Sequence, residues 1–313
     1  MSATRIAVVG VGRFGTEHLR TYATLEQVQL VGVLDADQAR AEAVAAQFAV
    51  PAYRSLEDLL TQARPDGVSI AVPATHRGAL IETVTAHGCA VLIEKPLAAD
   101  AATATRLAAR LDPARAMVGH VLRFAAPYTE LRSAARAIGG PWRGTSSRTR
   151  PADHLEDYPS ENVVGLTMVH DLDAIAWMTG ERIEQVRVRG ERAPDGRWSS
   201  VDAELTLSGG GSWTCHAGWD GPEADAMSLA GASLQITATG SKVRRPDGQA
   251  RRFGGAEDVY GAALRGELSH FVDRIQATGT PTNFDLDAAA GTVRAADAVL
   301  ASLERGGEQT VVS

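Results

Sequence analysis

The chain has only two cysteines, Cys89 and Cys215, among its 313 residues. Two thiols cannot form the set of disulfides that stabilises small secreted domains, and no Cys/His spacing resembles a zinc site. We therefore expect two buried, unreactive thiols and no metal. Long apolar runs are also absent, since none approaches the roughly 20 residues that a membrane-spanning helix needs.

Two further absences narrow the class of protein. The sequence passes from Met1 directly into the apolar run Ile6–Val9, without the regions of a secretory signal peptide, which predicts a cytoplasmic protein with no membrane partner. Basic residues are not in excess, because 31 Lys and Arg face 38 Asp and Glu. The resulting net charge of −7 argues against nonspecific nucleic-acid binding.

The first part of the chain alternates short apolar runs with helical patterns, and the length allows two domains. Strands are expected at Ile6–Val9, Gln29–Leu34, Gly67–Val72, Ala90–Ile93 and Ala116–Val118. Helices are expected at Thr16–Leu25, Gln38–Phe48, Gly78–His87 and Ala99–Leu111, with a short capped helix after Ser55. This alternation predicts an α/β fold, a doubly wound parallel Rossmann sheet.

The pattern changes after about Gly119. Strands are expected at Arg143–Arg150, Gln185–Arg192, Ala203–Leu207, Ser212–Ala217 and Ala232–Thr239, with a hairpin over Lys242–Phe253. Helices are expected at Tyr128–Ile138, Leu172–Met178, Ala262–Thr278 and Leu286–Glu304. The pattern is typical of an α+β domain with an open, largely antiparallel sheet. The predicted division is residues 1–121 and 122–313.

A glycine pattern joins the first predicted strand to the first predicted helix. The residues Gly10, Val11, Gly12, Arg13, Phe14 and Gly15 match G-x-G-x-x-G in the structural context that this pattern requires. The first glycine allows a tight turn, the second lets a pyrophosphate approach the backbone, and the third permits close packing of helix and strand. The helix N-terminus then offers free N–H groups to phosphates.

The end of the second predicted strand carries Asp35, which lies 20 residues after Gly15. A carboxylate at this spacing accepts hydrogen bonds from the adenosine ribose, and it repels a 2′-phosphate. No arginine directly follows Asp35, so the sequence predicts NAD(H) rather than NADP(H). The loop after the third strand contains Val72, Pro73, Ala74 and His76, and it is expected to line the ribose and nicotinamide. A surface histidine at a helix entry is the other interpretation of His76.

The fourth predicted strand ends in Glu94, Lys95 and Pro96. A lysine at this edge of the sheet could polarise a substrate oxygen or shuttle a proton, although most lysines are simply exposed. Glu94 and Lys95 complete the set expected to contact the cofactor.

Several motifs together resemble the Gfo/Idh/MocA oxidoreductases, which include glucose–fructose oxidoreductase and inositol dehydrogenase. They are Gly10–Gly15, Asp35, Glu94–Pro96, Gly119–Phe124, His170–Asp173 with Trp177 and Gly180, and Glu267–Phe271. The resemblance implies hydride transfer between NAD(P) and a sugar or cyclitol hydroxyl. It also implies a catalytic role for Lys95 and a proton-exchanging role for His170. A homo-oligomer, dimer or tetramer, formed through the C-terminal sheet is implied as well.

One position departs from the family pattern. The family usually has an aspartate four residues before the histidine, where this chain has Leu166. A leucine side chain can neither orient an imidazole nor accept a proton. Either His170 works with Lys95 alone, or Tyr158, Asp153 or Asp173 stands in, or the reaction needs less base chemistry.

A second group of residues is expected to bind a small-molecule substrate. It consists of His120, Arg123, Arg148, Arg150 and Asp173. The arginines suit bidentate binding of a carboxylate or phosphate, but structural salt bridges or a solvated strand face are alternatives. Around Gly119–Phe124 and Arg148–Pro151, the sequence is most similar to family members that act on nucleotide-linked amino sugars and uronates. The cations Lys242, Arg244, Arg245, Arg251 and Arg252 are interpreted as a solvated face rather than a phosphate site.

These features favour an NAD-dependent dehydrogenase or reductase of a sugar-like substrate, with Lys95 polarising the reacting oxygen and His170 exchanging the proton. Leu166 keeps two alternatives open. One is an NADH-dependent reductase of a C=N or C=C bond, and the other is a non-catalytic NAD-sensing regulator.

Overall fold

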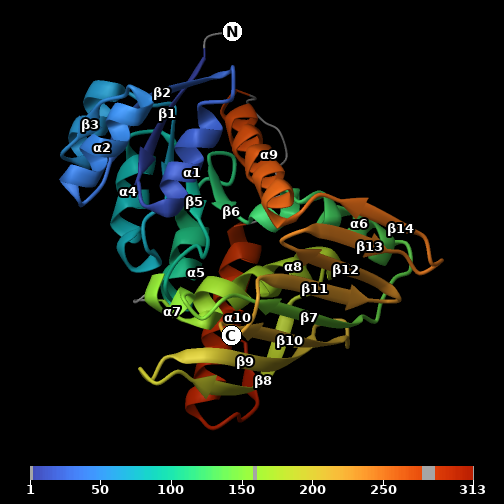
Figure 1. Ribbon diagram of the computed structural model, residues 1–313. Coiled ribbons are helices and arrows are strands. Elements are labelled where there is room, and N and C mark those ends of the chain that lie inside the picture. Colours follow the sequence, from blue (N-terminus) through green and yellow to red (C-terminus); the bar gives the residue numbers. More distant parts are fainter. Residues whose placement is uncertain (1–2, 158–160, 277–285, 313) are drawn as a thin grey trace. The chain divides into compact units, whose positions relative to one another are not determined.

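The computed structural model describes residues 3–157, 161–276 and 286–312. The chain forms two compact units (Figure 1). The first unit contains Met1–His120 and Leu264–Ala290, and the second contains Val121–Ala263 and Gly291–Ser313.

The first unit is built on a six-stranded sheet with the order β3-β2-β1-β4-β5-β6. All of its strand pairs are parallel, which confirms the predicted doubly wound sheet. Its elements are β1 (Thr4–Val9), α1 (Arg13–Tyr22), β2 (Val28–Leu34), α2 (Gln38–Phe48), β3 (Ala52–Tyr53), α3 (Leu56–Asp58), β4 (Gly67–Ile70), α4 (Gly78–Ala86), β5 (Ala90–Glu94), α5 (Ala101–Arg110), β6 (Ala116–Gly119) and part of α9 (Ala256–Gln276). The central strands are buried on both faces, so they consist almost entirely of apolar residues.

Helix α1 begins at Arg13, three residues before the predicted start at Thr16. The helix starts this early because the chain turns sharply at Gly10, whose φ of +85° suits glycine. A Cβ built on Gly15 would lie 1.8 Å from the Gly10 carbonyl oxygen, whereas one built on Gly12 would meet nothing within 4 Å. The third glycine therefore permits the contact between helix and strand, and the second leaves the backbone open.

The chain returns to the first unit near its C-terminus. Leu264–Ala290 belongs to this unit. The division predicted from the sequence, at residue 121, places this segment in the second domain. The physical reason is packing, because Phe271 and Ile275 of α9 contact the site of Gly67 at the start of β4. Gln276 also donates a hydrogen bond of 2.8 Å to the Thr4 hydroxyl.

The second unit is built on a nine-stranded sheet with the order β14-β13-β12-β11-β7-β10-β9-β8-β15. Its pairs are antiparallel except for β7 with β10, which confirms the predicted open, mostly antiparallel sheet. Its elements are α6 (Ala126–Arg136), β7 (Arg143–Thr149), α7 (His154–Asp157), α8 (Val169–Thr179), β8 (Ile183–Arg192), β9 (Trp198–Leu207), β10 (Ser212–Gly218), β11 (Ala224–Leu229), β12 (Ala232–Thr237), β13 (Gly240–Arg244), β14 (Ala250–Phe253), most of α10 (Leu286–Glu304) and β15 (Thr310–Val311). The sequence did not predict β11 or β15.

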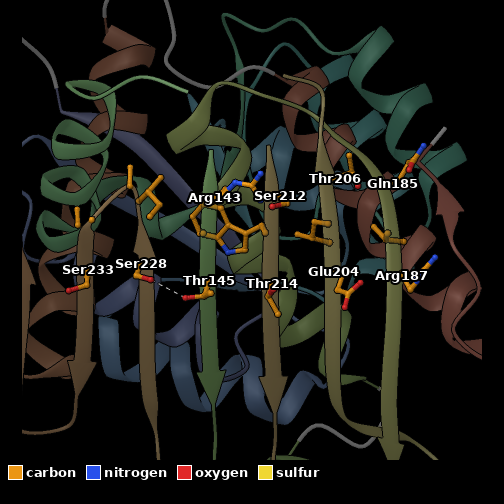
Figure 2. Close-up of a pocket in the computed structure, with 18 of the residues that line it drawn as sticks. Arg143, Thr145, Gln185, Arg187, Glu204, Thr206, Ser212, Thr214, Ser228 and Ser233 are labelled. Atoms are coloured by element: carbon orange, nitrogen blue, oxygen red, sulfur yellow. Dashed lines mark hydrogen bonds between the residues drawn. The ribbon is translucent and has the colours of Figure 1, made fainter. Parts of the chain in front are cut away.

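The two faces of this sheet differ in character. On one face, apolar side chains of the strands pack against α6, α8 and α10 in a single core. Leu131, Ile175 and Val299 are among the contributions of the three helices. The strands alternate buried and exposed residues, so the opposite face carries Ser, Thr and charged side chains (Figure 2). Within the described ranges, none of the helices combines the length and the apolar character that a membrane crossing requires.

The glycine contacts predict a difference between two alanine variants. Gly15→Ala is expected to lower the free energy of unfolding by about 1–3 kcal/mol, because its Cβ overlaps the Gly10 carbonyl. Gly12→Ala, the matched control, is expected to change the stability of the ligand-free protein by less than about 1 kcal/mol. Urea denaturation without cofactor measures both values. Equal losses of stability in the two variants would contradict the packing role of Gly15.

Candidate functional site

The glycine-rich loop at the β1–α1 junction forms the first part of the site. The Gly10 N–H donates to the Leu34 carbonyl at 2.8 Å, which ties the loop to the end of β2. The N-cap of α1 is Gly12, and no side chain caps the helix N-terminus. Its free N–H groups and the open space at Gly12 together fit a bound pyrophosphate.

Asp35 lies at the end of β2, beside this loop. Its carboxylate accepts hydrogen bonds from the Val11 N–H at 2.7 Å and the Asp37 N–H at 2.9 Å. Arg40 of α2 donates to the same carboxylate at 2.9 Å. Burial alone would raise the pKa of Asp35, but these hydrogen bonds outweigh it and lower the pKa, so the carboxylate is ionised at neutral pH. The sequence did not indicate Arg40, which lies five residues after Asp35 rather than directly after it.

The loop after β4 begins at Ala71 and includes a short 3₁₀ turn, Ala74–His76. Pro73, Thr75 and His76 are exposed there, while Val72 and Ala74 are half-buried. Arg77, which is only 4% exposed, donates to the Val72 carbonyl at 2.9 and 2.7 Å. It also donates to the carbonyls of Glu94 and Pro96. Arg77 thus fixes the loops after β4 and β5 to each other, a role that the sequence did not indicate.

Lys95 follows β5 and is only 8% exposed. Its backbone N–H donates to the Glu94 carboxylate at 3.1 Å. Its side-chain ammonium nitrogen lies 5.9 Å from the centre of the Phe14 ring. Phe14 lies in the first turn of α1, within the glycine pattern, and is 44% exposed, which is unusual for so large an apolar side chain. The first unit therefore brings Lys95 and the glycine-rich loop together.

The side chain of Glu94 has buried partners of its own. His18 Nε2 of α1 lies 2.9 Å from Glu94 Oε1. Burial alone would raise the pKa of Glu94, but the His18 hydrogen bond and the charges of His18, Lys95 and Arg77 lower it. Glu94 was predicted to contact the cofactor, and its contacts in the structure are with these protein groups.

In the second unit, His170 is the second residue of α8 and is half-buried. A π-helical turn, Val164–Met168, precedes the helix, and such turns are frequent at functional sites. Leu166 lies in this turn and packs against the apolar core. The next residue, Thr167, receives a hydrogen bond of 2.7 Å from the Trp219 indole N–H.

Arg148 was expected to bind substrate, and the structure places it in a buried ion cluster. The side chain is 1% exposed and donates five hydrogen bonds, to Asp171, Asp225, Tyr128 and Tyr260. A guanidinium has five N–H donors, so every donor of Arg148 is used within the protein. Burial raises the pKa of Asp171 in this cluster despite the adjacent Arg148 charge.

The other predicted substrate residues lie at different depths. Arg123 holds Asp173 through two hydrogen bonds of 2.9 and 2.5 Å, and both side chains are buried. Arg150 donates to Asp225 at 2.8 Å and keeps 13% of its side chain exposed. His120 is the last residue of the first segment of the first unit and is 3% exposed.

The candidates to replace the aspartate at Leu166 also differ. Asp173 is bound to Arg123, while Asp153 is largely exposed and lies 3.6 Å from His154. Tyr158 lies outside the described residues.

Both cysteines are buried, and burial raises the pKa of each thiol, as expected for unreactive side chains. In the part of the chain that the structure describes, no group of three or more His, Cys, Asp or Glu side chains could hold a metal ion.

Comparison with known proteins supports the assignment of the first unit. Residues 4–120 match the family described as "Oxidoreductase family, NAD-binding Rossmann fold". An inositol 2-dehydrogenase of Renibacterium salmoninarum is 31% identical over 189 residues, which are 58% of this chain and 57% of that protein. A UDP-N-acetylglucosamine 3-dehydrogenase of Acidithiobacillus ferrooxidans is 31% identical over 212 residues, 66% of this chain and 64% of that protein. The matched parts thus span less than two thirds of these curated relatives.

Solved structures extend the similarity to both units. The structure of a UDP-N-acetylglucosamine 3-dehydrogenase from Acidithiobacillus ferrooxidans has a TM-score of 0.85 at 26% identity, covering 98% of this chain and 100% of that one. A myo-inositol 2-dehydrogenase from Lactobacillus plantarum shares the fold, with a TM-score of 0.87 at 20% identity and full coverage of both chains. Residues 4–120 thus match the NAD-binding Rossmann domain of the Gfo/Idh/MocA oxidoreductases, and over its full described length the chain resembles dehydrogenases in fold.

Proposed function

We propose that this protein is an NAD(H)-dependent oxidoreductase that transfers a hydride to or from a ring carbon of a cyclitol or sugar-like substrate. One observation carries the proposal most directly. A nearly buried lysine, Lys95, stands beside the dinucleotide loop at the end of β5, with its backbone held on both sides by Glu94 and Arg77. Such an ordered cation is suited to polarise a C–O group rather than to interact with solvent.

Residues of the first unit bind the cofactor and orient the substrate oxygen. The N–H groups at the start of α1 and the open backbone at Gly12 bind the pyrophosphate, and Asp35 accepts hydrogen bonds from the adenosine ribose. When bound, NAD supplies the carbon that accepts or donates the hydride. Lys95 holds the substrate oxygen and stabilises the charge that develops on it. His170, carried by the second unit, exchanges the hydroxyl proton.

The proposed substrate class rests on the relatives and on the arginines. The two enzymes named in the comparisons act on inositol and on UDP-N-acetylglucosamine, and both substrates present ring hydroxyls. Arg148 is not used as a substrate ligand in this proposal, because all five of its donors are bonded within the protein. His120 and the partly exposed Arg150 remain the proposed substrate contacts, and the Arg123–Asp173 pair joins the 3₁₀ turn Val121–Phe124 to α8.

Leu166 favours a second candidate, the NADH-dependent reduction of a C=N or C=C bond. Its side chain packs on the apolar core, so this position supplies no carboxylate to His170. Reduction of an imine demands less of a general base than oxidation of an alcohol. Assays of NADH oxidation with cyclic imines and with inosose ketones separate the two candidates.

The catalytic role of Lys95 predicts a large loss of turnover in Lys95→Ala. With NAD⁺ and myo-inositol, scyllo-inositol or UDP-N-acetylglucosamine, kcat is expected to fall about 10²–10⁴-fold, while the Kd for NADH changes less than about threefold. Lys242→Ala is the matched control, because Lys242 lies on β13 in the second unit. Activity of Lys95→Ala close to wild type would show that the proposed role is wrong.

The Asp35–Arg40 pair predicts a change of cofactor preference. Asp35→Ser removes the charge that repels a 2′-phosphate and leaves Arg40 to pair with it, so the Kd ratio of NADPH to NADH is expected to fall about tenfold or more. Fluorescence titrations with both cofactors measure this ratio. Adding Arg40→Ala is expected to abolish the gain. An unchanged ratio in Asp35→Ser would contradict the assignment of Asp35 to the ribose.

We also propose a homo-oligomer formed by the open face of the nine-stranded sheet. This face has a hollow of about 770 Å³, lined by hydroxyl groups such as those of Thr145, Ser212 and Ser228 (Figure 2). On this face, Arg187 and Arg189 of β8 stand directly opposite Glu204 and Asp202 of β9, so charges of both signs are paired across these two strands.

The strand order favours a particular symmetry. A two-fold axis parallel to β7, the central strand, would place β7 of one copy over β7 of the other, and β13 and β14 over β8 and β15. Side chains on β7 of the two copies then lie close to the axis.

This arrangement predicts that Thr145→Arg disrupts the oligomer. Thr145 is exposed on β7, so the new arginines of two copies would meet near the axis. The dissociation constant is expected to rise at least about tenfold. Light scattering after size-exclusion chromatography measures the mass at several concentrations. Thr61→Arg, on the surface of the first unit, is the control, and an unchanged mass in Thr145→Arg would exclude this face as the interface.

A further inference from the structure

A buried series of hydrogen-bonded side chains leads to Glu94 at the end of β5. Neither cofactor binding nor the proposed chemistry explains why these polar groups are there. His18, on α1, is 1% exposed. Its Nε2 lies 2.9 Å from Glu94 Oε1, and its Nδ1 lies 3.3 Å from the Ser69 hydroxyl of β4. The Tyr22 hydroxyl, also from α1, lies 2.9 Å from the same Ser69 oxygen. The series thus joins α1, β4 and β5.

One assignment of protons satisfies every group in this series. Tyr22 donates to Ser69, Ser69 donates to His18 Nδ1, and His18 donates through Nε2–H to Glu94. Burial raises the pKa of Tyr22, which keeps its hydroxyl protonated and able to donate. The series of donors therefore ends at the Glu94 carboxylate. The lowered pKa of Glu94 agrees with an ionised acceptor.

Glu94 connects these hydrogen bonds to the backbone of Lys95. While Oε1 is held by His18, Oε2 accepts the Lys95 N–H at 3.1 Å. On the other side of the peptide, Arg77 lies 3.5 Å from the Lys95 carbonyl oxygen. A rotation of the Glu94 side chain would release the first of these contacts, and the His18 hydrogen bond opposes that rotation.

We propose that His18 is a positioning residue for Lys95. It acts through Glu94 and links the lysine to α1, the helix whose N-terminus forms the dinucleotide loop. His18 does not touch the substrate or the reacting atoms, so its influence is confined to the orientation and charge environment of Lys95. The inference rests on the proposed function only in taking Lys95 as the catalytic lysine.

The composition of the chain makes a direct test available. Lys95 and Lys242 are its only lysines, so Lys242→Arg leaves Lys95 as the single lysine. In protein labelled with ¹³C and ¹⁵N lysine, NMR then follows the titration of the Lys95 side chain alone. The titratable and charged side chains around it are those of Glu94, His18 and Arg77.

In this background, His18→Ala is expected to lower the midpoint of the Lys95 titration by about half a pH unit or more. The reason is that a less firmly held Glu94 carboxylate stabilises the lysine charge less well. Glu94→Gln is expected to lower it further. His18→Gln keeps an N–H donor for Glu94 and is expected to stay near wild type. His87→Ala, which changes a more exposed histidine of the same unit, is the control.

A kinetic measurement separates positioning from folding. With whichever of myo-inositol, scyllo-inositol or UDP-N-acetylglucosamine the wild type oxidises, His18→Ala is expected to lower kcat about ten- to hundredfold. The Kd for NADH is expected to change less than about threefold. A merely structural role would instead lower the melting temperature and weaken NADH binding without moving the Lys95 midpoint.

Two outcomes overturn the inference. One is an unchanged Lys95 midpoint in a folded His18→Ala variant. The other is full additivity of His18→Ala and Glu94→Gln, because residues that act through each other should show coupled effects. If His18→Ala does not fold, His18→Gln and Glu94→Gln carry the comparison. If none of the three substrates is oxidised by the wild type, the proposed substrate class fails, while the NMR titration still decides the role of His18.

Discussion

The first unit depends on the close approach of α1 to β1 at Gly10 and Gly15. With no Cβ on Gly15, the helix backbone comes close to the Gly10 carbonyl, and the first turn of the helix starts directly beside the end of the sheet. This one contact sets where the free N–H groups of α1 stand. It also sets where the next turn of the helix delivers His18, against Ser69 and Glu94. Cofactor loop and lysine loop are therefore placed by the same helix.

The sequence predicted the parts of the fold that depend on local pattern. The parallel sheet followed from apolar runs, and α2 and α10 were predicted with the bounds they have in the structure. Local pattern could not show that α9 contributes its C-terminal part to the first unit, since that depends on the contact of Phe271 and Ile275 with the start of β4. It also missed β11, where Asp225 is buried and Ala226 is exposed, the reverse of the usual alternation in a strand.

Residue type alone was a weaker guide to the site. The glycines and Asp35 were predicted from their spacing, which reflects a backbone requirement. Arg40, Arg77 and His18 were not, because each acts on a partner from another element, and nothing in the neighbouring sequence marks that partner. Arg148 shows the converse. Its residue type and its position near a motif suggested a substrate contact, but its side chain is buried in ion pairs with Asp171 and Asp225. Tertiary contacts, rather than composition, distinguish these cases.

The parallel pair β7–β10 has a consequence for how the large sheet is assembled. Strands β8 to β10 form one antiparallel meander and β11 to β14 form another, and in the sheet order these two meanders are joined only through β7. Each meander consists of local hairpins that can form early, whereas β7 must pair with strands about 70 to 80 residues further along the chain. The insertion of β7 is therefore the step of high contact order on which the continuity of the sheet depends. A circular permutation that opened the chain between β10 and β11 would keep both meanders intact and alter only how β7 is delivered to them.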